Sequence, residues 1–439
     1  MIFIIKNGNF KKKKSETISN TDSDLRWNFK MGLLHGIFFY GGQAFGNPDT
    51  VLPVFLNNFT GSKTIIGLSS TVIGSLGGIG NVVPQLFVAN KLESKPYKRP
   101  LLRFAITLRA LCWAFLSLTT FLFAEHYPHL MIFLLLFFLL IFTFMGGVAV
   151  VPFYDIWAKS LPSGIRGRFF GHRQLWGGIT AIGSGYITKI ILGNDRITFP
   201  DNYALLFLFA FIMIGISYLA LGSVREPVQE VHKDTLTFKE FLRKAFNILK
   251  KDKNYGIFLY VQILGGVSAL ALPFYVLYAR DFLEIKLDMV GIFLMARMVG
   301  GVISNIIWAY ISDFAGNKKV IQISTFLGFI IPLIAFFTNK DQPVLFIILF
   351  VIIGFFIAGR TIGKNNFLLD IATPKDRPTY ISLSGTLTFP VMFFPLLGGI
   401  LIQHISYKAV FLITSLAVFG GFLLSFWLKE PRKKEIPKG

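Results

Sequence analysis

Long apolar segments separated by short polar stretches make up most of this sequence. A helix needs roughly 20 apolar residues to cross a bilayer core about 30 Å thick, and membrane helices tolerate the Gly and Pro that several segments contain. The chain is therefore predicted to be an all-α integral membrane protein with twelve transmembrane helices, at residues 29–57, 65–90, 101–124, 130–156, 169–192, 202–223, 256–280, 288–312, 320–338, 342–364, 378–403 and 406–428.

Composition agrees with this prediction, because 53% of the 439 residues are hydrophobic and only 15% are charged, against about a quarter in soluble domains. The single cysteine, Cys112, excludes an intrachain disulfide and a multi-cysteine metal site. The six histidines lack a His-Glu-x-x-His spacing, and no nucleotide-binding loop occurs. We therefore expect no metal, no cofactor and no enzymatic activity; a polytopic membrane enzyme is the less favoured class.

The net charge of +21 indicates topology rather than nucleic-acid binding. If the spans alternate in direction, 35 of the 44 Lys and Arg lie on the side of both termini, 7 on the other side and 2 within spans. Positive charge gathers on the cytoplasmic side of a membrane. Both termini are therefore predicted to be cytoplasmic, in a multi-pass protein of the plasma membrane whose basic face attracts anionic lipid head groups.

Polar stretches divide the spans into two groups of six. The segment 225–255 contains TFKEFLRKAFNILKK, whose pattern favours either an amphipathic helix on the membrane surface or a solvated linker helix. It separates a first bundle, 28–224, from a second, 256–430. The lysine-rich segment 1–27 is expected to be a disordered cytoplasmic tail, and 431–439 a basic one.

The two groups also carry an internal repeat. At an offset of 220 residues, VLPVF (51–55) aligns with ALPFY (271–275), and ANKLESKPYKRP (89–100) aligns with AYISDFAGNKKV (309–320) without a gap. Several coincidences in one register indicate duplication. Two six-helix halves related in this way are an architecture of secondary transporters.

The loop AYISDFAGNKKV resembles the signature that the major facilitator superfamily carries between its eighth and ninth helices, Gly-x-x-x-Asp-Arg-x-Gly-Arg-Arg. Asp313, Gly316 and Lys318 match it, although the first Gly and two of its Arg are replaced. The corresponding loop of the first half matches at Glu93 and Lys98. PSGIRGRFFG (162–171), which includes Arg166, is similar to the family's Arg-Gly stretch between the fourth and fifth helices. GGITAIGSG (177–185) lacks the Pro of the family's antiporters, which disfavours drug/proton antiport.

The resemblance implies two bundles that rock about a central site lined by the first, fourth, seventh and tenth helices. It also implies that Asp313 holds the cytoplasmic ends together in one state; Arg377 and Lys318 are its candidate partners. A loop acid that only caps a helix is the alternative interpretation of Asp313. The gating candidates are Glu93, Lys98, Asp313, Gly316, Lys318, Arg166 and Arg377.

Polar residues within the spans are the candidates for substrate and proton binding, because ionisable groups inside a membrane are costly and mark functional sites. Asp49 lies in the outer half of the first span between Pro48 and Pro53, where the helix is expected to bend. On an ideal helix His35 and Gln43 would share a polar stripe with it. Asp49 carries a proton or cation, or it is a structural partner of an arginine or a helix cap.

Arg297 lies near the middle of the eighth span. It could bind an anionic substrate or pair with Asp49. Such a buried pair between the two halves would be either a switch that a proton or substrate breaks, or a fixed structural ion pair.

Three further groups in the second half have no single interpretation. Arg360 and Lys364, one turn apart, either line the cavity or extend to the cytoplasm, and Gln262 is a further binding candidate. Arg109 and Arg173 lie within reach of an interface, so we expect their side chains to snorkel.

These features favour a secondary transporter, a symporter that moves a small organic solute by alternating access and is coupled to protons. Since no ATP site is visible, the energy must come from a gradient. An uncoupled facilitator and a drug exporter of the same fold are the alternatives. The expected partners are the solute, a proton or other coupling ion and the lipid bilayer, with a monomer as the functional unit.

Overall fold

The computed structural model describes residues 22–74, 78–81, 84, 97–227, 248–340, 342–373 and 376–431, and all structural statements concern these residues. The described chain is helical. Its main helices are α1 (Asp22–Phe45), α2 (Val51–Asn57), α3 (Lys63–Ile73), α5 (Arg99–Phe123), α6 (Pro128–Ser160), α7 (Ser163–Leu192), α8 (Asp201–Gly222), α10 (Lys253–Gly266), α11 (Tyr275–Leu283), α12 (Met289–Ala315), α13 (Asn317–Phe337), α14 (Pro343–Ile371), α15 (Arg377–Leu387), α16 (Phe394–His404) and α17 (Tyr407–Ser425).

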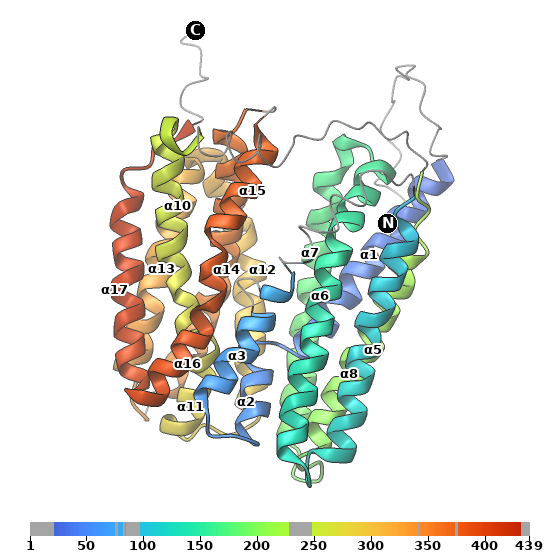
Figure 1. The fold of residues 1–439 in the computed structure, drawn as a ribbon, viewed down its shortest axis with the longest axis vertical. Helices are drawn as coiled ribbons and strands as arrows, with labels where there is room; N and C mark the ends of the chain where they lie inside the picture. The colour runs from blue at the N-terminus through green and yellow to red at the C-terminus, as the bar shows by residue number, and fades with distance from the viewer. Residues whose placement is uncertain are drawn as a thin grey trace.

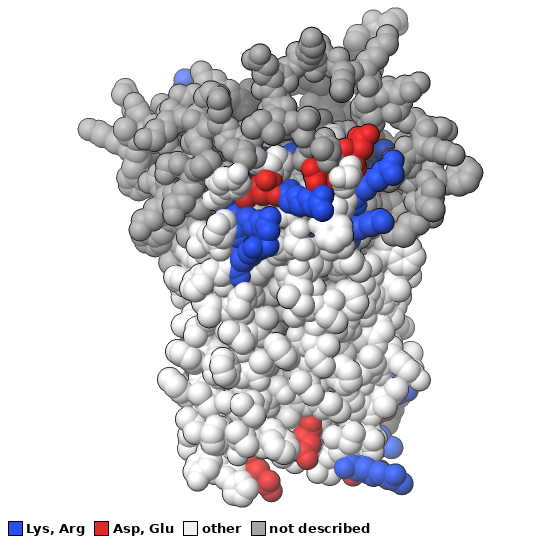
Figure 2. Space-filling model, turned by 90° about the vertical axis from the view of Figure 1, so that its right-hand side faces the viewer, with Lys and Arg blue, Asp and Glu red and all other residues white. Residues whose placement is uncertain are grey.

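Two bundles of helices lie side by side (Figure 1). Ten helical stretches of the described chain are long and apolar enough to cross a membrane. The first expected span corresponds to α1 with α2, and the second begins with α3. On the face shown in Figure 2, a band of uncharged side chains separates charged residues at the two ends. The predicted all-α membrane fold is confirmed.

We call the end where α1 begins and α17 ends the inner end, and the opposite end the outer end (Figure 1). α1 begins at Asp22, so residues 22–27 are helical and the disordered tail predicted to reach residue 27 is wrong for them. Asp24 pairs with Arg225 at 2.6 Å, and the Asn28 amide exchanges two hydrogen bonds with the Arg225 backbone. These contacts fix the start of α1 on the segment that follows α8. The predicted amphipathic helix lies mostly in 228–247, outside the described residues.

Among the expected spans that the structure describes throughout, three are interrupted, and each interruption contains proline. The first breaks between Phe45 and Val51, the bend that Pro48 predicted. The seventh passes from α10 to α11 through two short 3-10 helices, Val267–Leu270 and Leu272–Phe274. The eleventh passes from α15 to α16 through a third, Phe389–Phe393. Proline lacks the N–H that a helix interior needs, so the helical hydrogen bonds are interrupted there.

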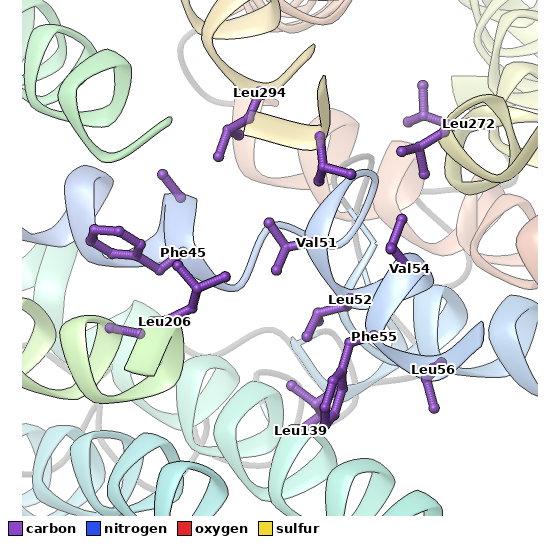
Figure 3. Close-up of a cluster of buried hydrophobic side chains, with 14 of the residues drawn as sticks. Phe45, Val51, Leu52, Val54, Phe55, Leu56, Leu139, Leu206, Leu272 and Leu294 are labelled. Carbon is purple, nitrogen blue, oxygen red and sulfur yellow. The ribbon is translucent and has the colours of Figure 1, made fainter. Parts of the chain in front are cut away.

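The two halves contact each other at the outer end. α7 packs on α12, α3 on α16 and α2 on α11. Figure 3 shows side chains around the break of the first span, from Phe45 to Leu56, beside Leu272 and Leu294 of the second half. These residues belong to one buried hydrophobic cluster, to which the second half contributes only residues from the outer parts of its helices.

At the inner end the second half has its own smaller cluster, which includes Tyr255, Phe258 and Phe367 and has no member from the first half. Phe314, at the inner end of α12, is 76% exposed. Tyr154, at the inner part of α6, is also exposed. The described halves are therefore joined at the outer end and diverge toward the inner end (Figure 1).

Candidate functional site

The interruption of the first span places Asp49 between the halves. Asn47 forms the turn, because its Oδ1 accepts hydrogen bonds from the Asp49 N–H at 3.0 Å and from the Thr50 hydroxyl at 3.1 Å. Asn side chains commonly stabilise turns in this way. Pro48 cannot donate a backbone hydrogen bond, so the helix does not continue through the turn. The local sequence GNPDT thus directs the Asp49 carboxylate toward the buried interface between the halves.

Arg297 of α12 binds this turn from the other half. Its Nη2 lies 3.0 Å from Asp49 Oδ2, and its Nη1 donates a hydrogen bond to Asn47 Oδ1 at 2.8 Å. The side chains of Arg297 and Asp49 are only 9% and 3% exposed. The pair that the sequence suggested as one alternative is therefore present, and it links the halves near the outer end.

Further polar contacts join the halves at the same end. Lys63, the first residue of α3, pairs with Asp281 of α11 at 2.9 Å, and Tyr407 also donates to this carboxylate. The Leu396 N–H donates to Thr71 Oγ1 at 3.1 Å. Ion pairs that reach solvent contribute little, so the buried Asp49–Arg297 pair dominates the electrostatics of this interface.

His35 does not continue a polar stripe toward Asp49, so this prediction is wrong. The imidazole contacts Ser217 of α8 through Nδ1 at 2.5 Å and Arg173 of α7 through Nε2 at 3.1 Å. Ser217 donates its own proton to the His35 carbonyl, so Nδ1 donates to the serine and Nε2 accepts from the guanidinium. Gln43 is half-buried, and no hydrogen bond joins it to a described residue.

Arg173 and Arg109 do not snorkel, contrary to expectation. Arg173 is buried against Gly36 of α1, where a Cβ would lie 2.0 Å from its Cγ. Its guanidinium also lies 5.3 Å from the centre of the Phe153 ring. Arg109 lies over the Phe142 ring at 4.2 Å. Glycine and aromatic neighbours on other helices therefore hold both cations inside the first bundle.

Arg360 also points into its bundle. Its Nη2 donates to the carbonyl of Gln262 on α10 at 2.6 Å. The Gln262 side chain is buried, and its Oε1 has no hydrogen-bond partner among the described residues. Lys364 is half-buried one turn further along α14. The three residues that the sequence left open thus lie where α10 and α14 face each other.

A charged network joins the helices of the first half at the inner end. Lys98, a predicted gating residue, pairs with Asp155 of α6 at 3.1 Å, and Lys159 pairs with the same carboxylate. Glu226, only 1% exposed, accepts hydrogen bonds from the N–H groups of Lys98 and Arg99. A carboxylate at this position satisfies the free N–H groups at the start of α5.

Arg166 binds the C-terminal end of a helix, where backbone carbonyl groups are free. It donates to the Leu161 carbonyl at 2.8 Å and to the Ala158 carbonyl at the end of α6. Glu93 lies outside the described residues. The gating role of Arg166 and of Glu93 therefore remains a prediction.

The second half has a related arrangement. Glu430 accepts a hydrogen bond from the Lys318 N–H at 2.7 Å, at the start of α13. Gly316 has a φ of +87°, and a Cβ there would lie 2.4 Å from Glu430 Oε2. Glycine is therefore required at this signature position for its backbone conformation and for space.

The partners proposed for Asp313 do not contact it in this conformation. The Lys318 ammonium donates to the Phe426 carbonyl instead. Asp313 and Arg377 are both exposed, and no ion pair joins either side chain to a described residue. The structure places them at the inner end, on the second half, without a contact across the halves.

Glu226 and Glu430 were missed by the sequence reasoning, although a signal was available. Each half ends with a basic residue followed by Glu-Pro, in Arg225–Pro227 and Lys429–Pro431. A tripeptide repeated at the ends of both halves indicates a shared structural role. Among the described residues no group of three or more His, Cys, Asp or Glu is arranged to hold a metal.

Replacing Glu226 with alanine is expected to lower the free energy of unfolding by about 1–3 kcal/mol, because buried N–H groups of α5 lose their acceptor. Thermal unfolding in detergent would measure this loss. Glu125→Ala, at an exposed loop position, is the matched control. Equal stability of the two variants would show that Glu226 does not support the helix.

Comparisons with known proteins agree with this architecture. Residues 257–439 match the family model described as Major Facilitator Superfamily. No curated protein matches the sequence. A mutant of the nucleoside transporter NupG superposes with a TM-score of 0.68 at 16% identity, over 92% of this chain and 99% of that chain.

A bacterial homologue of the iron transporter ferroportin in its inward-facing state gives a TM-score of 0.66 at 12% identity, over 93% of this chain and 99% of that chain. An outward-facing structure of such a homologue gives 0.57 at 17% identity, over 91% and 98%. The second half of the chain thus matches the Major Facilitator Superfamily model, and more than nine tenths of the chain shares the fold of solved multi-pass membrane transporters.

Proposed function

We propose that this protein is a secondary transporter of the Major Facilitator Superfamily that moves a small organic solute across the plasma membrane by alternating access, coupled to protons and with both termini in the cytoplasm. The observation that carries the proposal is the distribution of contacts between the halves. Buried contacts, including Asp49–Arg297, lie at the outer end, whereas Phe314 and Tyr154 are exposed toward the inner end. This asymmetry is expected of one state of a rocking transporter.

The inner end is the cytoplasmic one under this proposal, so the described conformation is inward-facing. The higher TM-score to an inward-facing structure than to an outward-facing one supports this assignment. In the opposite state we expect Asp313 to engage a partner across the inner end, since it is exposed and unpaired to any described residue here.

The Asp49–Arg297 pair is proposed as the proton-sensitive latch of the outer end. Opening that end separates α12 from the turn at Asn47, which breaks the pair. In the closed state a proton on Asp49 removes the attraction and leaves a buried arginine that water would hydrate on opening. Protonation therefore favours the outward-open state, which is the condition for proton coupling.

Spin-label distances in nanodiscs test this proposal. Labels at Arg168 and Phe314 report the inner end, and labels at Thr198 and Lys286 report the outer end, in a Cys112→Ala background. We expect acidification to lengthen the outer distance and shorten the inner one together. Asp49→Asn should give the outward-open distances at every pH, because it mimics the protonated acid.

The control for this experiment is Asp195→Asn, which removes an exposed acid from the outer loop between α7 and α8. It should retain the pH response of the parent protein. Distances that alternate without any pH response would favour the uncoupled facilitator. A pH response that survives Asp49→Asn would show that another group carries the proton.

A further inference from the structure

The membrane-spanning helices hold an excess of positive charge away from their ends. Asp49 is neutralised by Arg297. Arg109, Arg173 and Arg360 each lie ten or eleven residues from the inner end of their helix, which corresponds to about 15 Å at 1.5 Å per residue. None of these three forms an ion pair with a carboxylate among the described residues.

The protein itself accommodates the two cations of the first half. His35 accepts a hydrogen bond from Arg173, and the Phe142 ring lies under Arg109. The second half provides fewer partners for its two cations, Arg360 and Lys364. Among the described residues, Arg360 has one hydrogen-bond acceptor, the Gln262 carbonyl, and Lys364 has none.

Arg360 faces protein rather than lipid. A Cβ added to Gly265 would lie 2.5 Å from the Arg360 Nη1, and a Cβ added to Gly266 would lie 3.2 Å from its Nη2. These two glycines end α10 where the seventh span is interrupted. Any side chain at Gly265 would displace the guanidinium, so the sequence leaves space for it beside a broken helix.

The surroundings of this pair are polar and incompletely satisfied. The buried Oε1 of Gln262, one turn before Gly265, lacks a hydrogen-bond partner. Thr361 and Asn365, which directly follow Arg360 and Lys364 in α14, are exposed, and the Thr361 hydroxyl donates to the Ile357 carbonyl of its own helix. Interrupted helices with free polar groups are where transporters of this kind bind their solutes. Two cations without a counterion inside a membrane protein are costly unless a ligand supplies the negative charge.

We infer that Arg360 and Lys364 bind the carboxylate or phosphate group of an organic anion, and that this anion is the transported solute. A guanidinium can hold two oxygens of either group in a planar fork, and an ammonium one helical turn away can contact a third position. This inference rests on the proposed transport function, which it narrows from small organic solutes to anionic ones.

Binding to the purified protein tests the inference with probes that differ in charge. Succinate and glycerol 3-phosphate are the anionic probes, glycerol is the neutral one and putrescine the cationic one. Calorimetric titration in detergent without phospholipid, repeated in nanodiscs of phosphatidylcholine or phosphatidylglycerol, separates a soluble anion from a lipid head group. We expect at least one anionic probe to bind, and neither the neutral nor the cationic probe.

Arg360→Gln and Lys364→Gln should each weaken binding by about 10- to 100-fold, the usual effect of a lost charged hydrogen bond. Arg196→Gln and Lys286→Gln remove the same charges from exposed loops and should leave the affinity unchanged. Thermal unfolding of each variant checks that it is folded.

Three results would overturn the inference. The first is no binding of either anionic probe, and the second is binding that survives both site variants. The third is that the only anion bound is the head group of phosphatidylglycerol. The third would assign the pair to a lipid head group. The spin-label experiment distinguishes these failures from failure of transport itself, since alternation between two states without anion binding would retain the transporter and reject the anion.

Discussion

Replacing Arg297 with glutamine should invert the pH dependence of the conformational equilibrium. Under the proposed proton coupling, the ionised Asp49 of the parent protein is paired, so high pH should favour the outer-closed state and acidification should open it. Without Arg297, the ionised carboxylate would be buried alone in the closed state. Breaking one partner of a buried pair costs about 3–5 kcal/mol, enough to reverse the populations of two states separated by a few kcal/mol.

The sign of the effect follows from which form of Asp49 the closed state disfavours. In Arg297→Gln, high pH leaves an unpaired carboxylate and favours opening, whereas acidification neutralises it and favours closing. The outer-end and inner-end spin-label distances, recorded across pH, measure both directions. The double variant Asp49→Asn/Arg297→Gln contains neither charge, so we expect it to show no response to pH at this latch.

A matched control is Lys63→Gln, which removes a cation from the solvent-accessible pair with Asp281 at the same interface. Surface pairs are worth about 1 kcal/mol or less, so this variant should keep the direction of the parent response. If Arg297→Gln also kept that direction, the buried pair would be a fixed structural element and proton coupling would have to reside elsewhere.

The sequence predicted the elements of this fold well because each rests on a local property. Apolar length predicted the spans, and Pro48 predicted the interruption after Phe45. The offset of 220 residues relates Asn47, in that interruption, to Val267, where the seventh helix changes to 3-10 geometry. These features depend on residues close together in the chain, which a single sequence displays directly.

Contacts between helices were harder to predict. An arginine inside a span can snorkel or be buried, and the outcome depends on the neighbouring helix. Gly36 of α1 leaves space for Arg173, and the Phe142 ring of α6 receives Arg109. Helical periodicity places a residue on a face of its own helix, but it does not say which helix that face meets.

The Asp49–Arg297 contact could be predicted as one alternative because both residues are rare charges inside the spans. Its geometry depends on Asn47, which the sequence reasoning did not consider. The Asn47 side chain accepts hydrogen bonds from its own turn and from Arg297. A polar residue before a proline inside an apolar segment is the signal that could have identified it.

A single methyl group at Gly291 should also shift the protein toward the outward-open state. Gly291 of α12 faces α7 of the other half, where its Cβ would lie 2.3 Å from the Lys189 backbone nitrogen. A backbone cannot move aside as a flexible side chain can. Overpacking typically costs about 1–3 kcal/mol, and here the protein can relieve it by opening the outer end.

Two alanine variants separate this effect from general destabilisation. A Cβ at Gly183, on α7, would meet no heavy atom within 4 Å, so Gly183→Ala should leave the spin-label distances unchanged. A Cβ at Gly300 would lie 2.2 Å from the Val351 carbonyl oxygen within the second half, so Gly300→Ala should lower the unfolding temperature without favouring either state.

Gly291→Ala alone should lengthen the outer distance, by a population change of about 5- to 150-fold if the whole overpacking energy acts on the equilibrium. The reason is that its clash exists only while the halves are in contact at the outer end, whereas the clash at Gly300 lies within one bundle and persists in both states. Unchanged distances in Gly291→Ala together with a lowered unfolding temperature would mean that α7 and α12 stay in contact throughout, so that the outer end does not open along this interface.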